Sequence, residues 1–90
     1  MEWKEEKLSR AISASSRRKI LRLLAERELT VKEIALQTKM SVSLASRHLK
    51  LLYDLGFLVV RKTFPNKFYS LKLKELKALL EQYDKVIQRI

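Results

Sequence analysis

Residues 30–58 read TVKEIALQTKMSVSLASRHLKLLYDLGFL, and this stretch decides the fold because it has the pattern of two short helices joined by a tight turn. Thr30 and Glu33 have the spacing of a capping box, in which each side chain bonds to a backbone N–H in the first helical turn. The inward face of this first helix recurs at i, i+3, i+4 and i+7, and it consists of Val31, Ile34, Ala35 and Thr38. The small alanine allows a second helix to pass closely.

The second helix is predicted to begin after Ser41, a good N-cap residue, and to end before Gly56, the only glycine of the chain. Lys39 and Met40 form the turn that precedes it. Its buried stripe is expected to consist of Ala45, Leu49, Leu52 and Leu55. The other side of this helix is therefore free to face outward.

The outward side near the start of the second helix carries mainly short hydroxyls and long cations, and its residues are Ser43, Leu44, Ser46, Arg47 and Lys50. Such side chains suit the major groove of DNA, because hydroxyls bond to base edges or phosphates and an arginine can bind guanine through two hydrogen bonds. A solvated surface is the alternative, since most charged helix faces have no other role. The helix-turn-helix pattern favours DNA binding.

Three segments resemble, in the same order and at the same spacing, the ArsR-type winged helix-turn-helix regulators. They read SSRRKILRLLAERELTVKEIA, SVSLASRHLKLLYDLGFLV and KFYSL, and they cover most of residues 15–71. The resemblance implies a winged-helix fold and DNA binding, although MarR-type and other winged-helix regulators share parts of the pattern. Lys39 departs from the family, which usually has glycine in the turn. Because a left-handed lysine costs roughly 1 kcal/mol, we expect a reshaped turn.

The resemblance does not extend to metal sensing. Metal-sensing members of the family read Glu-Leu-Cys-Val-Cys where this chain reads ELTVK at residues 28–32, so both thiolate ligands are missing. The last helix offers only Asp84 and Gln88 near the place of the ligands used by the family's zinc sensors. Because the chain has no cysteine and His48 is its only histidine, we expect no metal, no cofactor and no enzyme active site. His48 is interpreted as a packed or phosphate-bonding side chain.

Length and charge limit the classes of function. Ninety residues predict one domain with a marginal core, for which association with a second copy is a source of further burial. Twenty lysines and arginines against ten acidic residues give a net charge of +10, which favours a polyanionic partner such as DNA, RNA or an anionic membrane surface. We expect a cytoplasmic protein, because no apolar run reaches the ~18 residues of a membrane span and no signal-peptide pattern opens the chain.

Two further helices are predicted before the capping box. Residues 2–12 have few apolar side chains, namely Trp3, Leu8 and Ile12, so this helix is expected to pack on something outside its own domain. The next helix is the central core helix, capped by Ser15 or Ser16 and running to about residue 27. Arg17 and Arg18 lie in its first turn, where the helix dipole disfavours cations. They are interpreted as phosphate ligands, or as a chance placement in a basic chain.

A β-hairpin is predicted after Gly56, because residues 57–73 form two β-branched and aromatic runs separated by the turn sequence Phe-Pro-Asn-Lys at 64–67. Arg61, Lys62 and Lys67 surround its tip, as expected of a wing that grips phosphates or the minor groove. Phe68 and Tyr69 alternate across the strand, so one of them is predicted to be core. Base stacking in an RNA-binding sheet is the alternative.

The last segment has apolar residues at heptad spacing to the final position, and they are Leu73, Leu76, Leu80, Tyr83, Ile87 and Ile90. With Leu79 and Val86 beside it, the stripe is wider than one small domain is expected to bury. We interpret it as a dimer seam outside the domain core, with the Trp3 helix on its remaining edge. Packing on the chain's own core is the alternative.

The sequence thus predicts a mainly α domain with a small β-hairpin wing, a winged helix-turn-helix dimerised through its terminal helices. Residues 1–90 form one domain, with dimerisation helices at 1–13 and 73–90, a DNA-binding core at 14–72 and a wing at 57–72. The DNA-binding residues are expected to be Ser41, Ser43, Leu44, Ser46, Arg47, Lys50, Arg61, Lys62, Lys67, Arg17, Arg18 and Lys39. The dimer interface is expected to contain Trp3, Leu8, Ile12, Leu73, Leu76, Leu80, Tyr83, Ile87 and Ile90.

The expected function is a homodimeric, sequence-specific transcription regulator of double-stranded DNA. Two alternatives stay open: a weakly specific architectural DNA-binding protein, and a winged-helix module that docks a protein of a transcription complex. Any small-molecule effector would bind at the dimer interface, and its existence is unknown from the sequence.

Overall fold

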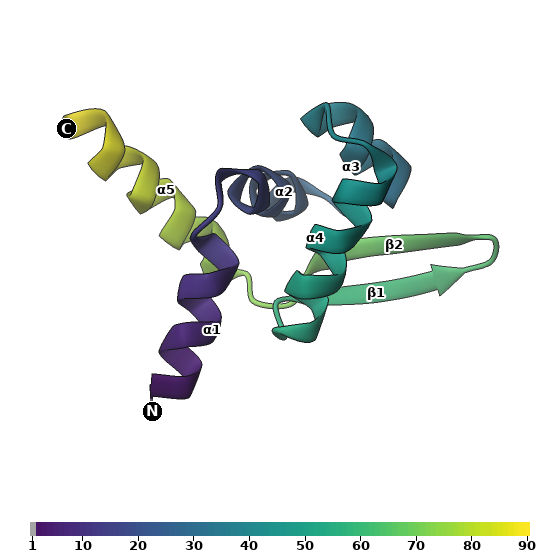
Figure 1. Ribbon diagram of the computed structural model, residues 1–90, viewed down its shortest axis with the longest axis horizontal. Helices are drawn as coiled ribbons and strands as arrows, with labels where there is room; N and C mark the ends of the chain where they lie inside the picture. The colour runs from purple at the N-terminus through teal and green to yellow at the C-terminus, as the bar shows by residue number, and fades with distance from the viewer. Residues whose placement is uncertain (1) are drawn as a thin grey trace.

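The computed structural model describes residues 2–90 as five helices and one two-stranded antiparallel hairpin (Figure 1). The elements, in chain order, are α1 Glu2–Ile12, α2 Ser15–Glu26, α3 Val31–Thr38, α4 Val42–Asp54, β1 Leu58–Thr63, β2 Asn66–Leu71 and α5 Glu75–Arg89. This is the mainly α architecture with a β-hairpin wing that the sequence predicts. Figure 1 shows α1 and α5 at one end of the long axis and the tip of the hairpin at the other.

Helix α2 is the centre of the fold, because it contacts α1, α3, α4, α5 and β2. Its inward side chains Ile20 and Leu21 are fully buried, and Leu24 is almost so. Burying a leucine or isoleucine side chain contributes about 1.5–3 kcal/mol, so this helix anchors the single core. The prediction that it is the core helix is confirmed.

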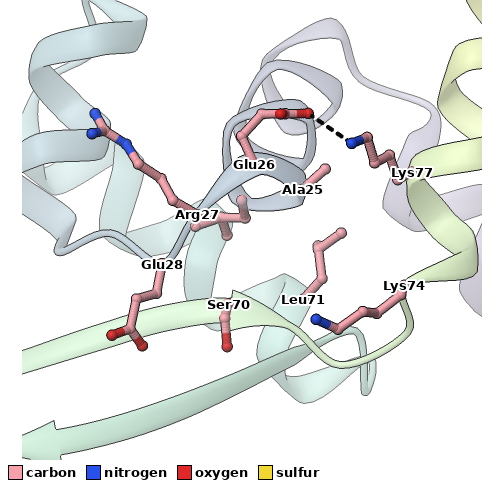
Figure 2. Close-up of a pocket in the computed structure, with 9 residues that line it drawn as sticks. Ala25, Glu26, Arg27, Glu28, Ser70, Leu71, Lys74 and Lys77 are labelled. Atoms are coloured by element: carbon pink, nitrogen blue, oxygen red, sulfur yellow. Dashed lines mark ion pairs between the residues drawn. The ribbon is translucent and has the colours of Figure 1, made fainter.

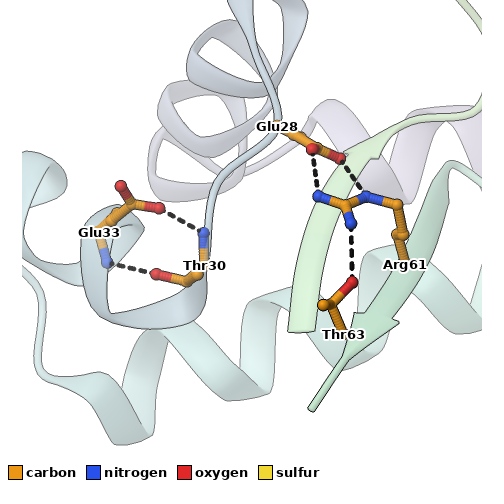
Figure 3. Close-up of polar contacts among 5 residues, drawn as sticks. All are labelled: Glu28, Thr30, Glu33, Arg61 and Thr63. Carbon is orange, nitrogen blue, oxygen red and sulfur yellow. Dashed lines mark hydrogen bonds and ion pairs between the residues drawn. The ribbon is translucent and has the colours of Figure 1, made fainter. Parts of the chain in front are cut away.

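The helix-turn-helix forms through the local bonds that its sequence predicts. The Thr30 hydroxyl accepts the Glu33 N–H at 3.3 Å, while the Glu33 carboxylate accepts the Thr30 N–H at 2.8 Å (Figure 3). The Ser41 hydroxyl accepts the Leu44 N–H at 3.0 Å and begins α4. Gly56 follows α4 at φ 93°, the left-handed conformation expected at this position.

The turn between α3 and α4 is not reshaped to avoid a left-handed lysine. Lys39 itself takes the left-handed conformation, with φ 58° and ψ 34°, and is the one non-glycine residue with positive φ among those described. The next residue, Met40, donates its N–H to the Ala35 carbonyl at 3.0 Å and closes the helix end. The chain therefore accepts roughly 1 kcal/mol of backbone strain in order to carry lysine here.

The start of α2 differs from the expectation. Neither Ser15 nor Ser16 caps the helix, because the N-cap is Ala14 and no side-chain cap bond forms. The serines lie inside the helix, and the long side chains that follow them reach back to the preceding helix instead. Arg17 donates to the Arg10 carbonyl at 2.7 Å.

Arg18 completes the junction of α1 with α2. Its guanidinium donates to the Ile12 carbonyl at 2.7 Å and stacks on the Tyr83 ring of α5, 4.8 Å from the ring centroid. Both arginines thus satisfy carbonyls at the C-terminal end of α1, which a helix cannot satisfy by itself. The cations that looked misplaced at the start of α2 are well placed at the end of α1.

Helix α1 packs on its own domain through a residue that the sequence analysis did not single out. Ala11 is fully buried, and Leu8 and Ile12 are partly buried against the core. This helix therefore packs on the core of its own domain, and its contact with a second copy stays a prediction. Trp3 alone among its larger apolar residues is mainly exposed, at 62%.

Helix α5 also differs from the expectation. Leu76 and Leu80 are 4% and 2% exposed in the single chain, so the heptad seam does not lie outside the domain core. The stripe is wide enough to serve two faces, and its inner face packs on α2. An ion pair between Arg22 and Asp84 joins the same two helices. The outer apolar residues, all at least 39% exposed, are Leu73, Leu79, Val86, Ile87 and Ile90.

The wing pairs in register from Leu58 opposite Leu71 to Thr63 opposite Asn66. Its base is held by a short bridge in which Leu29 and Tyr69 exchange two backbone hydrogen bonds, of 3.0 and 2.8 Å. Tyr69 packs against the core, whereas Phe68 lies beneath the Arg61 guanidinium, 4.6 Å from the ring centroid. The prediction that one of these aromatics belongs to the core is confirmed.

Candidate nucleic-acid interface

Helix α4 presents a polar face away from the core. Ala45, Leu49 and Leu52 are fully buried, and they fix the helix against α2 and α3. The exposed residues Ser43, Ser46, Arg47 and Lys50 follow the spacing i, i+3, i+4 and i+7, so they line one side of the helix. The structure therefore brings together four of the residues predicted on this helix.

Two neighbours of that face are partly covered. Leu44 is half-buried, so it borders the polar face instead of projecting from its middle. His48 is also partly buried, and burial is the main cause that lowers its pKa, with Arg17 and Arg47 adding electrostatic repulsion. Because its pKa lies below the usual value of histidine, His48 is neutral at pH 7. A packed side chain, one of the two readings of His48, is what the structure describes.

The predicted cations divide into engaged and free groups. Lys50 pairs with Asp54 at 3.1 Å, and Arg61 pairs with Glu28 at 2.6 Å. Among the described side chains, those of residues 3–90, no ion pair involves Lys39, Arg47, Lys62 or Lys67. These four exposed cations have no carboxylate to neutralise them, so they are available to an anionic partner.

Arg61 is the most constrained cation of the wing (Figure 3). Its guanidinium donates to both carboxylate oxygens of Glu28, at 2.6 and 3.3 Å, and to the Thr63 hydroxyl at 2.8 Å. The hydrogen bonds from Arg61 lower the pKa of Glu28, and the same bonds raise the pKa of Arg61. Arg61 therefore braces the wing against the connector between α2 and α3, while about half of its side chain stays exposed to solvent.

The net charge is concentrated on this side of the molecule. Residues 34–74, which contain the end of α3, all of α4 and the wing, hold eight lysines or arginines and one acidic residue, Asp54. The wing itself, 58–72, has no carboxylate. An approaching polyanion thus meets little repulsion along α4 and the hairpin.

The wing begins beside the end of α4, and β1 contacts that helix. Lys62 lies opposite Lys67 in the hairpin register, one pair behind the tip. Lys39 lies at the other end of α4, in the turn that precedes it. Lys39 therefore lies at the start of the polar face of α4, whereas Lys62 and Lys67 lie near the far end of the wing.

The structure adds exposed residues that the sequence analysis did not single out. Val42 in the first turn of α4 is 47% exposed, and Phe64 at the wing tip is 98% exposed. The position of Val42 directly after the N-cap could have marked it. For Phe64 the signal was an aromatic inside a turn, where no core can reach it.

A pocket of about 450 Å³ lies between the end of α2 and the end of β2 (Figure 2). Most of its charged groups are already paired: Glu26 with Lys77 at 3.4 Å, and Glu28 with Arg61 outside the pocket. Among residues 2–90 there is no group of three or more histidines, cysteines or carboxylates able to hold a metal. The described helices also include none that is long and apolar enough to cross a bilayer.

Comparison with known proteins places this geometry in context. The sequence profile of the bacterial regulatory protein arsR family matches residues 14–59. The transcriptional activator HlyU of Vibrio cholerae is 35% identical over 74 residues, which are 82% of this chain and 68% of HlyU. Its solved structure aligns with a TM-score of 0.82 at 32% identity, over 92% of this chain and 90% of that one.

A second solved structure is that of the homodimeric winged helix-turn-helix DNA-binding domain of Mb0332 from Mycobacterium bovis. It aligns with a TM-score of 0.83 at 26% identity, over 94% of this chain and 79% of that one. An overlap of this extent leaves only 6% of this chain outside the alignment.

Proposed function

Because this chain belongs to the arsR family of bacterial regulatory proteins, which are DNA-binding transcription regulators and not enzymes, we propose that it binds specific sites on double-stranded DNA as a homodimer. The observation that carries the proposal is the outward face of α4, with its hydroxyls and cations at helical spacing and with Arg47 forming no ion pair with the carboxylates described at residues 3–90.

In this proposal α4 enters the major groove. Arg47 lies in the middle of the exposed face and binds a guanine edge through two hydrogen bonds. Ser43 and Ser46 donate or accept at base edges or phosphates, and Lys50 exchanges Asp54 for a phosphate or base oxygen. The exchange costs little, because an exposed i,i+4 ion pair contributes only about 0.3–0.5 kcal/mol.

The phosphate contacts flank that helix. Lys39 and Ser41 are proposed to hold one strand at the start of α4, and Lys62 and Lys67 to hold the flanking backbone from the wing. Arg61 is proposed to contribute to phosphate binding through the exposed part of its guanidinium, while its bonds to Glu28 hold the wing in place. Arg17 and Arg18 are proposed to serve the junction of α1 with α2 first, because their strongest bonds are to α1 carbonyls.

Homodimerisation is supported by the apolar surface of the terminal helices. Trp3 on α1 and Val86, Ile87 and Ile90 on α5 are each more than half exposed, an arrangement that association would cover. The relative from Mycobacterium bovis is described as homodimeric. A two-fold dimer predicts a DNA site in the form of an inverted repeat.

Salt dependence of DNA binding tests the proposal. A dimer with three to five phosphate contacts per subunit should give a slope of log K against log salt of roughly −5 to −9, since each neutralised phosphate contributes about −0.9. Titration of a labelled duplex at several salt concentrations measures it. A slope shallower than about −2 contradicts DNA binding and favours a protein-docking module instead.

An architectural role is the second candidate, favoured by the net charge of +10. Affinity for a site selected from random duplexes, compared with bulk random DNA at one salt concentration, separates the two. A specific regulator exceeds its nonspecific affinity by ~10³ or more, whereas an architectural protein does not.

A further inference from the structure

The tip of the wing carries an aromatic side chain that the protein itself does not cover. Phe64 and Pro65 form the two-residue loop beyond the last pair of the hairpin, Thr63 opposite Asn66. The Phe64 side chain is 98% exposed, the highest value among the large apolar residues described. Figure 1 shows that the tip extends away from all five helices. No other part of the chain is therefore in a position to cover this ring.

The residues behind the tip are cationic. Lys62 and Lys67 are cross-strand partners, and like charges in that relation destabilise a hairpin. Neither lysine forms an ion pair with the side chains described, those of residues 3–90, and the wing has no carboxylate of its own. A ligand of the tip must therefore accept an apolar ring at its centre and positive charges on both sides of it. A groove with negatively charged edges meets both requirements when the stacked bases at its floor separate and accept the ring between their apolar faces.

The minor groove of DNA has this chemistry, because phosphates line its two edges and base pairs form its floor. We propose that Phe64 is an apolar wedge that enters the minor groove and presses against a base step, while Lys62 and Lys67 hold the phosphates on either side. Partial unstacking by an apolar side chain bends the duplex toward the major groove, where α4 lies in the proposed complex. This inference rests on the proposed function and assigns Phe64 a positioning role in it.

The wedge predicts readout at bases that the polar side chains do not touch. Pyrimidine–purine steps unstack more readily than other steps, so sites with such a step beneath the wing tip should bind more tightly. Sites selected from random duplexes by the intact protein should be enriched in TA or CA steps on both flanks of the inverted repeat.

Three single variants test the wedge: Phe64→Ala, Phe64→Leu and, as a charge control, Lys62→Ala. Each is measured on one selected duplex for affinity, salt slope and bend, the bend by energy transfer between dyes at the duplex ends. Phe64→Ala should lose about tenfold or more in affinity together with most of the bend, because the wedge is gone. Its salt slope should not change, because no charge is removed. Phe64→Leu should keep both affinity and bend, since leucine also acts as a wedge.

The control makes failure of the wedge distinct from failure of DNA binding. If Phe64→Ala binds and bends the duplex like the intact protein, while Lys62→Ala lowers the salt slope, the wedge is wrong and DNA binding stands. If Phe64→Ala changes transcription from a purified template without changing DNA affinity or bend, the tip contacts a protein and the wedge is likewise overturned. If the intact protein shows no salt-dependent binding, both inferences fail. Because Phe64 packs on nothing, unchanged circular dichroism of each variant is expected.

Discussion

The helix-turn-helix and the terminal helices use their apolar residues differently. In α3 and α4 one stripe is buried in the core, and the outer surface of each helix is exposed and mainly polar, apart from Leu36, Val42 and Tyr53. Leu76 and Leu80 of α5 are buried in the chain's own core. Ile87 and Ile90 continue the same heptad stripe but are exposed. A single periodic stripe is therefore buried along its first half and exposed along its second half. Periodicity shows that a helix packs, but it does not show against what.

The largest expected effect separates the two uses of α5. Leu80→Glu should unfold the domain, because it places a carboxylate among fully buried side chains at a cost of about 4 kcal/mol or more. Thermal and urea unfolding followed by circular dichroism measure it. Folded monomers in light scattering, which a seam outside the core would give, are not expected. Their appearance would show that α5 can leave α2 without loss of the fold.

Ile87→Glu is the matched variant, one heptad after Leu80 in the same stripe. Ile87 is 51% exposed, so the new carboxylate stays solvated and the domain should remain folded. The like charges that meet across a two-fold axis should instead produce monomers in sedimentation. Loss of the second half-site should lower affinity for an inverted repeat by about 10²-fold or more, with little change on a single half-site. An Ile87→Glu protein that stays dimeric would place the interface elsewhere, and Trp3 on α1 would be the next residue to test.

Replacing two cations of the DNA-facing side, Arg47 and Lys62, should impair DNA binding in different ways. Arg47→Ala should cost about 1–3 kcal/mol on a selected site and relax preference at one position, because Arg47 is proposed to bind a base. Lys62→Ala should weaken all sequences alike and lower the salt slope by about 1 per subunit, because Lys62 is proposed to bind phosphate. Competition titrations with selected and random duplexes distinguish these patterns. Uniform loss for both variants would remove base readout from α4.

The left-handed turn offers a smaller effect of opposite sign. Lys39→Gly should raise the free energy of unfolding by up to about 1 kcal/mol, because glycine has no Cβ to strain at φ 58°. The same variant should bind DNA more weakly and with a shallower salt slope, because a phosphate contact is lost. Lys39→Asn controls for backbone strain, since asparagine also tolerates this conformation while carrying no charge. Equal DNA affinity for all three proteins would exclude Lys39 from the interface.

The smallest effect concerns the capping box. The Thr30 N–H and hydroxyl lower the pKa of Glu33, so the ionised form is favoured in the folded state. A carboxyl with a depressed pKa stabilises the fold at neutral pH, and this contribution is lost as the pH falls below about 4. Glu33→Gln should therefore melt at a slightly lower temperature at pH 7 and lose less on acidification. Melting temperatures between pH 7 and pH 3 measure it, and parallel curves for the two proteins would contradict it.

Local signals explain what could be predicted from this sequence. The capping box at Thr30, the N-cap at Ser41 and the left-handed Gly56 each depend on residues within four positions, and the structure has all three. The contacts that were missed join separate helices or distant segments. The end of α1 was predicted correctly at residue 12, but its position does not show that the Arg17 side chain turns back to the Arg10 carbonyl. The carboxylate partner of Arg61, Glu28, lies 33 positions away along the chain.

Arg18 of α2 connects the two terminal helices, α1 and α5. The Arg18 guanidinium donates to the carbonyl of Ile12, the last residue of α1, and stacks on the ring of Tyr83 on α5, while its own backbone belongs to α2. Helices α1 and α5, which would contact a second copy, are thus both fixed to the central helix α2 through Arg18. In a dimer formed by α1 and α5, the distance between the two α4 helices would be fixed. Packed helices, and not a flexible linker, would connect them. The protein would then require half-sites at one spacing, about 34 Å for one turn of DNA, and would lose affinity when base pairs are inserted between them.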